Sequence, residues 1–150
     1  MRSLDRRWWV AIGVVVIALI ALIYSRLTAP PEECKPVLEL LEYNSSQGQL
    51  IREKTADEEG VPTAADEIAY QAWADGLAER ARNIDRDELR IAAVEVADLA
   101  ATFVRTMPEV RAAAESRVPG APTPAVVFEQ AARSDQIQRK LAELADACKP

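Results

Sequence analysis

The stretch LRIAAVEVADLAATFVRTM, residues 89–107, determines the fold class that the sequence predicts. Its apolar residues recur every three or four positions, the spacing that places side chains on one face of an α-helix. They are Leu89, Ala92, Val96, Leu99, Phe103 and Met107. The chain of 150 residues holds only 5 glycines, shows no strand-type alternation and is rich in helix formers after residue 36. The sequence therefore predicts one all-α domain.

A first helix is predicted on the N-terminal side of this stretch. It begins at Pro36, because a missing backbone N–H is tolerated in the first helical turn, and it ends before Gly60. Its apolar residues include Val37, Leu41 and Ile51. The middle of the segment, NSSQG at 44–48, is polar and helps a helix little. The sequence leaves open whether the helix breaks there.

Two further helices complete the predicted body. Thr63 and Asp66 have the spacing of a capping box, and Asp85 and Glu88 have the same spacing before the stretch 89–107. The helix after Thr63 has the stripe Tyr70, Trp73, Leu77, Ala81 and Ile84. Pro108 is expected to kink or end the third helix. Beyond the linker 118–124, the fourth helix has the stripe Val127, Ala131, Ile137, Leu141, Leu144 and Cys148.

The two cysteines lie in similar four-residue motifs at the two ends of this body, ECKP at 33–36 and ACKP at 147–150. In an up-down bundle of four helices, the start of the first and the end of the last lie at the same pole. We therefore predict a disulfide between Cys34 and Cys148, which implies an oxidising compartment. The alternative is a pair of unrelated buried thiols in a cytoplasmic protein.

The N-terminal segment WWVAIGVVVIALIALIY, residues 8–24, contains no charged residue. Its length is near the lower limit for a membrane-spanning helix, and its terminal Trp and Tyr residues suit the membrane interfaces. We predict an uncleaved anchor over residues 8–25. The alternative is a cleaved secretion signal, although Leu27 and Pro30 around Ala29 form a poor cleavage site.

The positions of the basic residues predict how the chain is oriented in the membrane. Arg2, Arg6 and Arg7 precede the span, so the positive-inside rule places residues 1–7 in the cytoplasm. Residues 26–35 are then a linker, and residues 36–150 form an extracytoplasmic bundle. The net charge of the whole chain is −6, which argues against nucleic acid as a partner.

The residue types needed for most catalytic chemistry are missing. The sequence has no histidine, and it contains neither a P-loop nor a GxGxxG motif. A disulfide would also occupy both thiols. We therefore expect no enzyme, no metal site and no cofactor. The acidic stretches at 56–60 and 85–88 fit helix ends better than ligand sites, and an enzyme that uses paired carboxylates is the remaining catalytic alternative.

The layout resembles that of small, single-pass exported helical proteins of actinobacteria. The resemblance covers the whole chain. It consists of one N-terminal span and a helical body that is rich in Ala and Arg and has a cysteine in a CKP motif near each of its ends. Such proteins are mostly of unknown function. The resemblance implies this topology and offers no mechanism.

Two functions are compatible with these features. The first is a non-catalytic accessory subunit or scaffold of a membrane assembly in the cell envelope, with another membrane protein as partner. Small residues that let helices approach closely in lipid line one side of the span: Ala11, Val14, Ala18, Ala21 and Ser25. The alternative is a binding module for a small apolar or lipid-like ligand, held between the helices near Tyr70, Trp73 and Phe103.

Overall fold

The computed structural model describes residues 31–55 and 63–149 of the chain. The predicted tail 1–7 and anchor 8–25, most of the linker 26–35 and the acidic stretch 56–60 lie outside these residues. Within the described part of the chain, no helix is both long and apolar enough to cross a membrane.

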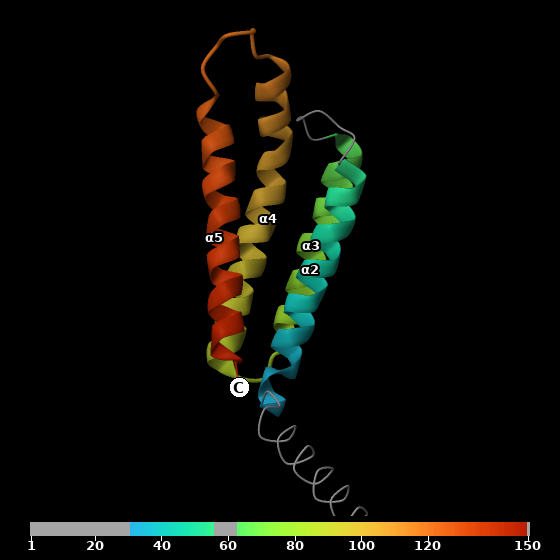
Figure 1. The fold of residues 1–150 in the computed structure, drawn as a ribbon, viewed down its shortest axis with the longest axis vertical. Helices are drawn as coiled ribbons and strands as arrows, with labels where there is room; N and C mark the ends of the chain where they lie inside the picture. Colours follow the sequence, from blue (N-terminus) through green and yellow to red (C-terminus); the bar gives the residue numbers. More distant parts are fainter. Residues whose placement is uncertain (1–30, 56–62, 150) are drawn as a thin grey trace, which may run out of the picture. The chain divides into compact units, whose positions relative to one another are not determined.

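The described residues form a short 3₁₀-helix and four long α-helices, and they contain no strand. The elements are η1 (Glu32–Cys34), α2 (Lys35–Thr55), α3 (Ala64–Arg82), α4 (Asp87–Glu115) and α5 (Ala125–Ala147). Successive helices run antiparallel (Figure 1), with α2 packed on α3, α3 on α4 and α4 on α5. The first and last helices, α2 and α5, contact each other only sparsely. The predicted all-α class with four helices is confirmed.

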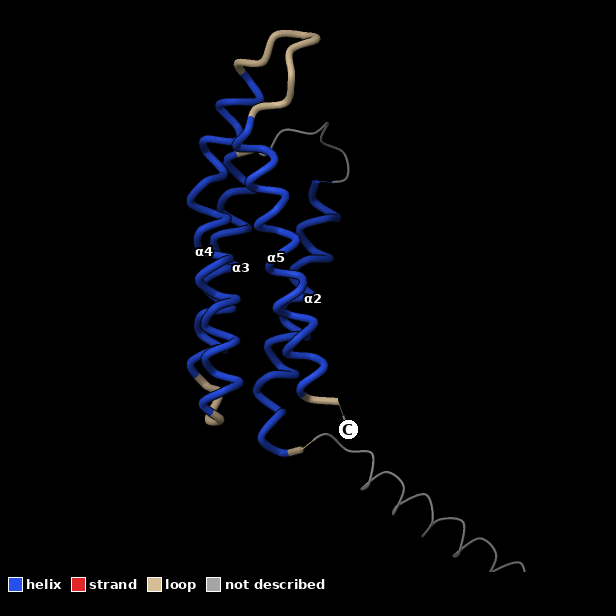
Figure 2. Tube along the Cα trace, turned by 90° about the vertical axis from the view of Figure 1, so that its left-hand side faces the viewer, coloured by secondary structure: helices blue, strands red, loops and turns tan. Residues whose placement is uncertain are grey.

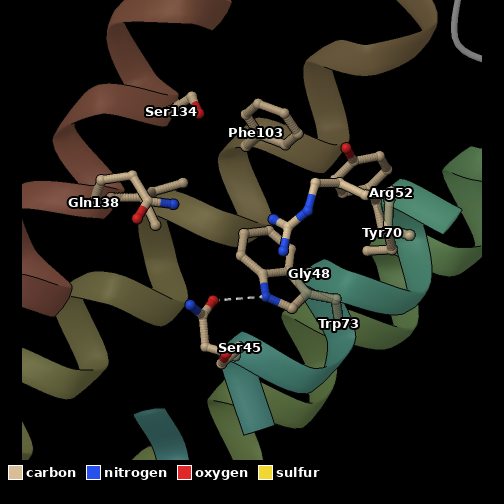
Figure 3. Close-up of a pocket in the computed structure, with 11 residues that line it drawn as sticks. Ser45, Gly48, Arg52, Tyr70, Trp73, Phe103, Ser134 and Gln138 are labelled. Atoms are coloured by element: carbon tan, nitrogen blue, oxygen red, sulfur yellow. Dashed lines mark hydrogen bonds between the residues drawn. The ribbon is translucent and has the colours of Figure 1, made fainter. Parts of the chain in front are cut away.

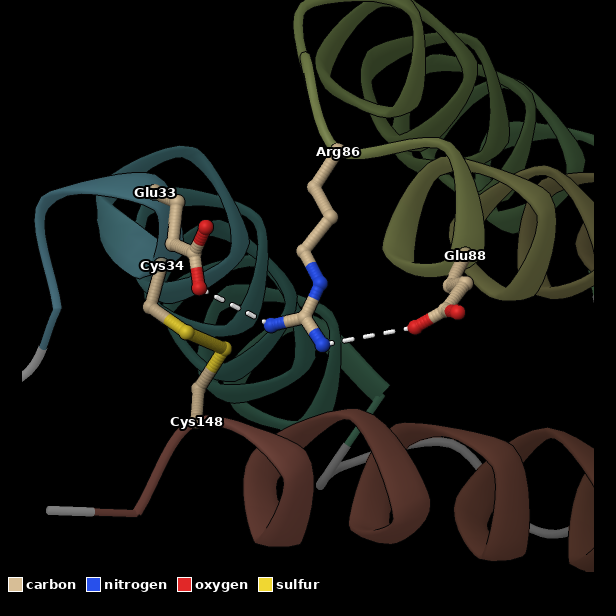
Figure 4. Close-up of a disulfide and its surroundings, with 5 residues drawn as sticks. All are labelled: Glu33, Cys34, Arg86, Glu88 and Cys148. Atoms are coloured by element: carbon tan, nitrogen blue, oxygen red, sulfur yellow. Dashed lines mark hydrogen bonds and ion pairs between the residues drawn. A yellow bond between two sulfur atoms is a disulfide. The ribbon is translucent and has the colours of Figure 1, made fainter.

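The ends of the chain's helical body meet at one pole of the bundle. Cys34 and Cys148 are joined in a disulfide, their Cα atoms are 5.6 Å apart, and both residues are buried. Figure 4 shows the Arg86 guanidinium beside this bridge, where it donates to Glu33 Oε1 at 2.9 Å and to Glu88 Oε2 at 3.3 Å. The predicted proximity of the two cysteines is therefore confirmed, and it follows from the even number of helices.

The two predicted capping boxes have different outcomes. The box at α3 is confirmed, because the Thr63 backbone N–H donates to Asp66 Oδ2 at 2.8 Å and the Asp66 N–H donates to Thr63 Oγ1 at 3.3 Å. The box at Asp85 is wrong, because α4 has Arg86 as its N-cap and no side chain caps it. The Arg90 side chain instead donates to the carbonyl oxygens of Ile84 and Asp85 and holds this turn from within the helix.

Neither the polar stretch of the first helix nor Pro108 interrupts its helix. α2 is continuous through residues 44–48 (Figure 2), and α4 is continuous to Glu115 with Pro108 inside it. A proline in a helix removes one backbone hydrogen bond. Near this point a side chain of α5 reinforces α4, since Gln130 Nε2 donates to the Phe103 carbonyl at 3.0 Å. Of the two predicted outcomes at Pro108, a kink or a helix end, the helix end is therefore wrong.

The buried face of α4 is wider than the predicted stripe and lies slightly to one side of it. Leu89, Val96 and Met107 are buried as predicted, but Leu99 and Phe103 are only half-buried. The other buried side chains of α4 are Ala93, Ala97, Ala100 and Val104. Because α4 packs against both α3 and α5, its buried face is wide, and Leu99 and Phe103 lie at the edge of the core.

Candidate binding cleft

A cleft of about 400 Å³ lies between α2 and α5, two helices that contact each other only sparsely. Its floor consists of aromatic side chains from α3 and α4, and its walls consist of mostly polar side chains from α2 and α5 (Figure 3). The lining residues are Asn44, Ser45, Gly48, Ile51, Arg52, Tyr70, Trp73, Phe103, Ser134, Ile137 and Gln138. We call this site the α2–α5 cleft.

The three rings singled out in the sequence lie together in the floor of the cleft. The ring centroids of Tyr70 and Phe103 are 5.5 Å apart, and those of Trp73 and Phe103 are 6.3 Å apart with planes at 80°. Tyr70 and Trp73 meet edge to face at 6.1 Å. Such pairs stabilise each other beyond their buried area, so the floor is a preformed aromatic surface.

The polar wall on α2 is tied to this floor. The indole N–H of Trp73 donates to Asn44 Oδ1 at 3.0 Å, which satisfies a buried donor and fixes the ring plane. Directly before Asn44, Tyr43 lies against Gly76 of α3, and its hydroxyl donates to the Ala72 carbonyl at 2.9 Å. A Cβ atom on Gly76 would lie only 2.0 Å from the Tyr43 hydroxyl oxygen, so this close approach requires glycine.

The sequence explains why the cleft is open. Along α2, Asn44 and Gly48 fall on the same helical face as the buried residues Val37 and Ile51. Along α5, the buried residues Gln130, Ile137, Leu141 and Leu144 follow steps of three and four residues that would include position 134. Position 134 is a serine, and it is exposed. Small or polar residues thus occupy three positions at which a closed bundle has large apolar side chains.

Charge in the cleft comes from α2. Among the described residues that line the cleft, Arg52 is the one with a charged side chain, and Figure 3 shows its guanidinium between the rings of Tyr70 and Trp73. Burial raises the pKa of Tyr70 above 10.0, the nearby Asp66 raises this pKa further, and the positive charge of Arg52 opposes the shift. Tyr70 is therefore a neutral phenol at physiological pH. It can exchange hydrogen bonds with a ligand but is no base.

A second polar contact holds α4 and α5 together one helical turn beyond Phe103. The Thr106 hydroxyl donates to Gln130 Oε1 at 2.6 Å, and Arg133 Nη1 donates to both side chains at 3.2 and 3.3 Å. Gln130 is buried, so these partners remove the cost of a buried amide. The contact fixes the wall that carries Ser134 relative to the floor.

The remaining predicted sites are placed as follows. The proposed partner face, Ala11, Val14, Ala18, Ala21 and Ser25, lies outside the described residues. Of the acidic residues at 85–88, Asp85 precedes α4, whereas Asp87 and Glu88 lie in its first turn and pair with Arg90 and Arg86, respectively. Within residues 31–55 and 63–149, no three side chains of the metal-binding types converge.

Sequence reasoning found the floor of the cleft but missed its walls. The sequence marks Asn44 and Gly48 only as part of a weak, polar helix segment, and it gives no prediction for Ser134. The available signal was their position on otherwise apolar faces. No protein-family model, curated protein or solved structure matches this chain. The function is therefore argued from the geometry of the bundle and from the sequence.

Proposed function

We propose that this chain is a non-catalytic, membrane-anchored binding protein of the cell envelope, whose helical body takes up a small ligand in the α2–α5 cleft. The observation that carries the proposal is the aromatic floor between two polar walls, in which the rings of Tyr70 and Phe103 are left partly exposed. The cleft volume of about 400 Å³ falls within the range of about 300–1,000 Å³ that ligand sites occupy.

Burial of the floor supplies a driving force for binding. Tyr70 and Phe103 are only half-buried, although each is large and apolar over most of its surface. Covering about 100 Å² of apolar surface contributes about 2.5 kcal/mol. A ligand that lies on the rings gains this energy, and the polar walls can bond its polar groups.

The membrane location comes from the sequence. Residues 8–25 are the predicted anchor, and the disulfide suits an oxidising compartment outside the cytoplasm. A binding module tethered by a short linker would sample ligands at or near the membrane surface.

Native mass spectrometry of the full-length protein, released from its native membranes, tests the proposal. The wild-type protein is expected to carry a small-molecule adduct. The double variant Gly48→Leu/Ser134→Leu, which fills the cleft from both walls, is expected to lose it. Ser46→Leu is the matched control, because Ser46 is exposed on α2 and does not line the cleft. An adduct of equal abundance on wild type and the filled variant, or none on wild type, would contradict the proposal.

A second candidate is an accessory subunit or scaffold of a membrane assembly. Its support is the row of small residues in the predicted span, together with the exposed apolar side chains Ile68, Ile91 and Phe128 of the body. These three lie on α3, α4 and α5, and therefore do not mark one docking helix. Crosslinking in native membranes should recover a reproducible protein partner, and it should do so equally with the filled cleft variant.

A further inference from the structure

The walls of the α2–α5 cleft differ in chemistry from its floor, and this difference limits what fits. Apolar contacts come from the three rings and from Ile51 and Ile137, which lie deepest. Hydrogen-bonding groups are found on both walls, including those of Ser45, Ser134 and Gln138. A wholly apolar ligand would leave these polar groups without partners, whereas an amphiphile satisfies both surfaces.

The length of the cleft is set by the helical rise. From Asn44 to Arg52 the lining of α2 spans eight residues, which corresponds to about 12 Å along the helix axis. Gly48 lies near the middle of this span, and a Cβ atom added there meets only Arg52 Nη1, at 3.5 Å. A narrow, extended chain can therefore lie along α2 above the rings.

The charge of the residues that line the cleft indicates the charge of the ligand's polar group. Over residues 27–150 the chain has 14 basic and 23 acidic residues, yet among residues 31–55 and 63–149 no acidic side chain lines the cleft and Arg52 does. A guanidinium has five N–H donors and can hold more than one acceptor, so its contacts within the protein do not prevent it from binding a ligand carboxylate. Figure 3 shows the Arg52 guanidinium over the floor, between the rings of Tyr70 and Trp73.

We infer that the cleft binds an anionic single-chain amphiphile, with its acyl chain on the Tyr70, Trp73 and Phe103 rings and its head group at Arg52. The inference rests on the proposed function and names its ligand class. The acyl chain enters between α2 and α5, which contact each other only sparsely. The head group stays near the open side of the cleft, where water and Arg52 both solvate it.

Photolabelling of the full-length protein in membranes tests this inference. The probe is dodecanoate with a diazirine in its chain, and the comparison probe has the same chain with a trimethylammonium head. After irradiation, peptide mapping locates the label. Dodecanoate is expected to label residues 44–52 and 134–138 about tenfold more than the cationic probe does, the change that one charge-assisted hydrogen bond produces.

Three variants sharpen the result. Gly48→Leu/Ser134→Leu should abolish label in the cleft and leave label in residues 8–25 unchanged, which serves as the internal control for membrane contact. Arg52→Gln should lower cleft labelling by dodecanoate to the level of the cationic probe. Arg52→Lys keeps the charge and should retain most of the labelling. The helix content and disulfide of each variant, measured by circular dichroism and mass, establish that it is folded.

Equal labelling of the cleft by both probes would overturn the anionic head group. Label confined to residues 8–25 with both probes would overturn the amphiphile as ligand. The native adduct described above does not depend on the head group of a probe. Its presence alongside a failed photolabelling result would mean that the ligand class is wrong and the site is right, and its absence would mean that the site itself is wrong.

Discussion

The half of the bundle near the disulfide and the half that holds the α2–α5 cleft are built differently. Near Cys34 and Cys148 large side chains of all four helices and of the α3–α4 connection are fully buried: Val37, Leu40, Leu77, Ile84, Val96 and Leu144. In the cleft half, the rings of Tyr70 and Phe103 are only half-buried, and Asn44, Gly48 and Ser134 leave the walls apart.

A small bundle can keep a site open in one half when its other half is closely packed. An uncovered aromatic floor forfeits some of the stability that a closed core would give. The disulfide and the packed pole offset this loss, because they hold the ends of α2 and α5 together without contacts along their full length.

Breaking the disulfide should have the largest effect. A bridge across a loop of about 100 residues contributes about 4.7 kcal/mol in the chain-entropy model, and the cysteines here are 114 residues apart. Cys148→Ser should therefore lower the Tm by roughly 15 °C, measured by circular dichroism. The double variant Cys34→Ser/Cys148→Ser should match the single one. A fall of less than about 5 °C would mean that the packed pole is stable without the bridge.

The two glycines that face other side chains should respond in opposite ways to alanine. In Gly76→Ala the new methyl group collides with Tyr43, and overpacking of this kind costs about 1–3 kcal/mol. In Gly48→Ala the new methyl group enters the open cleft, so the higher helix propensity of alanine should add about 1 kcal/mol. Urea unfolding of both variants measures the difference. Equal effects would mean that the cleft is as closely packed as the Tyr43 contact.

Substitutions at the N-termini of α3 and α4 should have smaller effects on the free energy of unfolding. Thr63→Ala removes a capping hydrogen bond and should lower the free energy of unfolding by about 1 kcal/mol. Asp85→Ala should change it by less than about 0.5 kcal/mol, because Asp85 does not cap α4. Denaturant titration checks both values. A large loss in Asp85→Ala would restore the capping role that its sequence position suggests.

The smallest effect concerns pH. The pKa of Tyr70 is raised in the folded state by burial, so the folded state holds the phenol proton more tightly than the unfolded state does. Stability should be unaffected below pH 10.0, the unfolded value, and should fall as the pH rises beyond it. The pKa of Tyr43 is raised as well, also mainly by burial. The fall should be shallower in Tyr70→Phe, and a slope identical to that of wild type would show that the ring floor is not desolvated.

Some features of the fold and of the cleft could be predicted from the sequence, and others could not. Apolar periodicity gave the four helices, and the even helix count gave the proximity of Cys34 and Cys148. Periodicity also put Tyr70, Trp73 and Phe103 on inward faces. It did not reveal whether opposing residues fill the space above them, because that depends on how far apart α2 and α5 lie.

Local rules failed where tertiary contacts competed with them. The spacing of Asp85 and Glu88 matches a capping box, yet Arg90 bonds the carbonyl groups of the turn and α4 begins at Asp87 without such a cap. Pro108 suggests a helix end, yet packing against α3 and α5 on both sides keeps α4 helical. The sequence leaves open whether the polar residues at 44–48 break the first helix, and in the structure α2 is continuous there and Asn44 accepts a hydrogen bond from Trp73.

The central claim is that the α2–α5 cleft is open in order to hold a ligand. It is tested most directly by the Tm of the full-length protein before and after exhaustive removal of bound small molecules in a fluorinated surfactant. A ligand present at 100 times its Kd contributes about 2.7 kcal/mol, so wild type should lose several degrees on ligand removal. Gly48→Leu/Ser134→Leu should lose none. An equal change in the two proteins, or no change in wild type, would contradict the account.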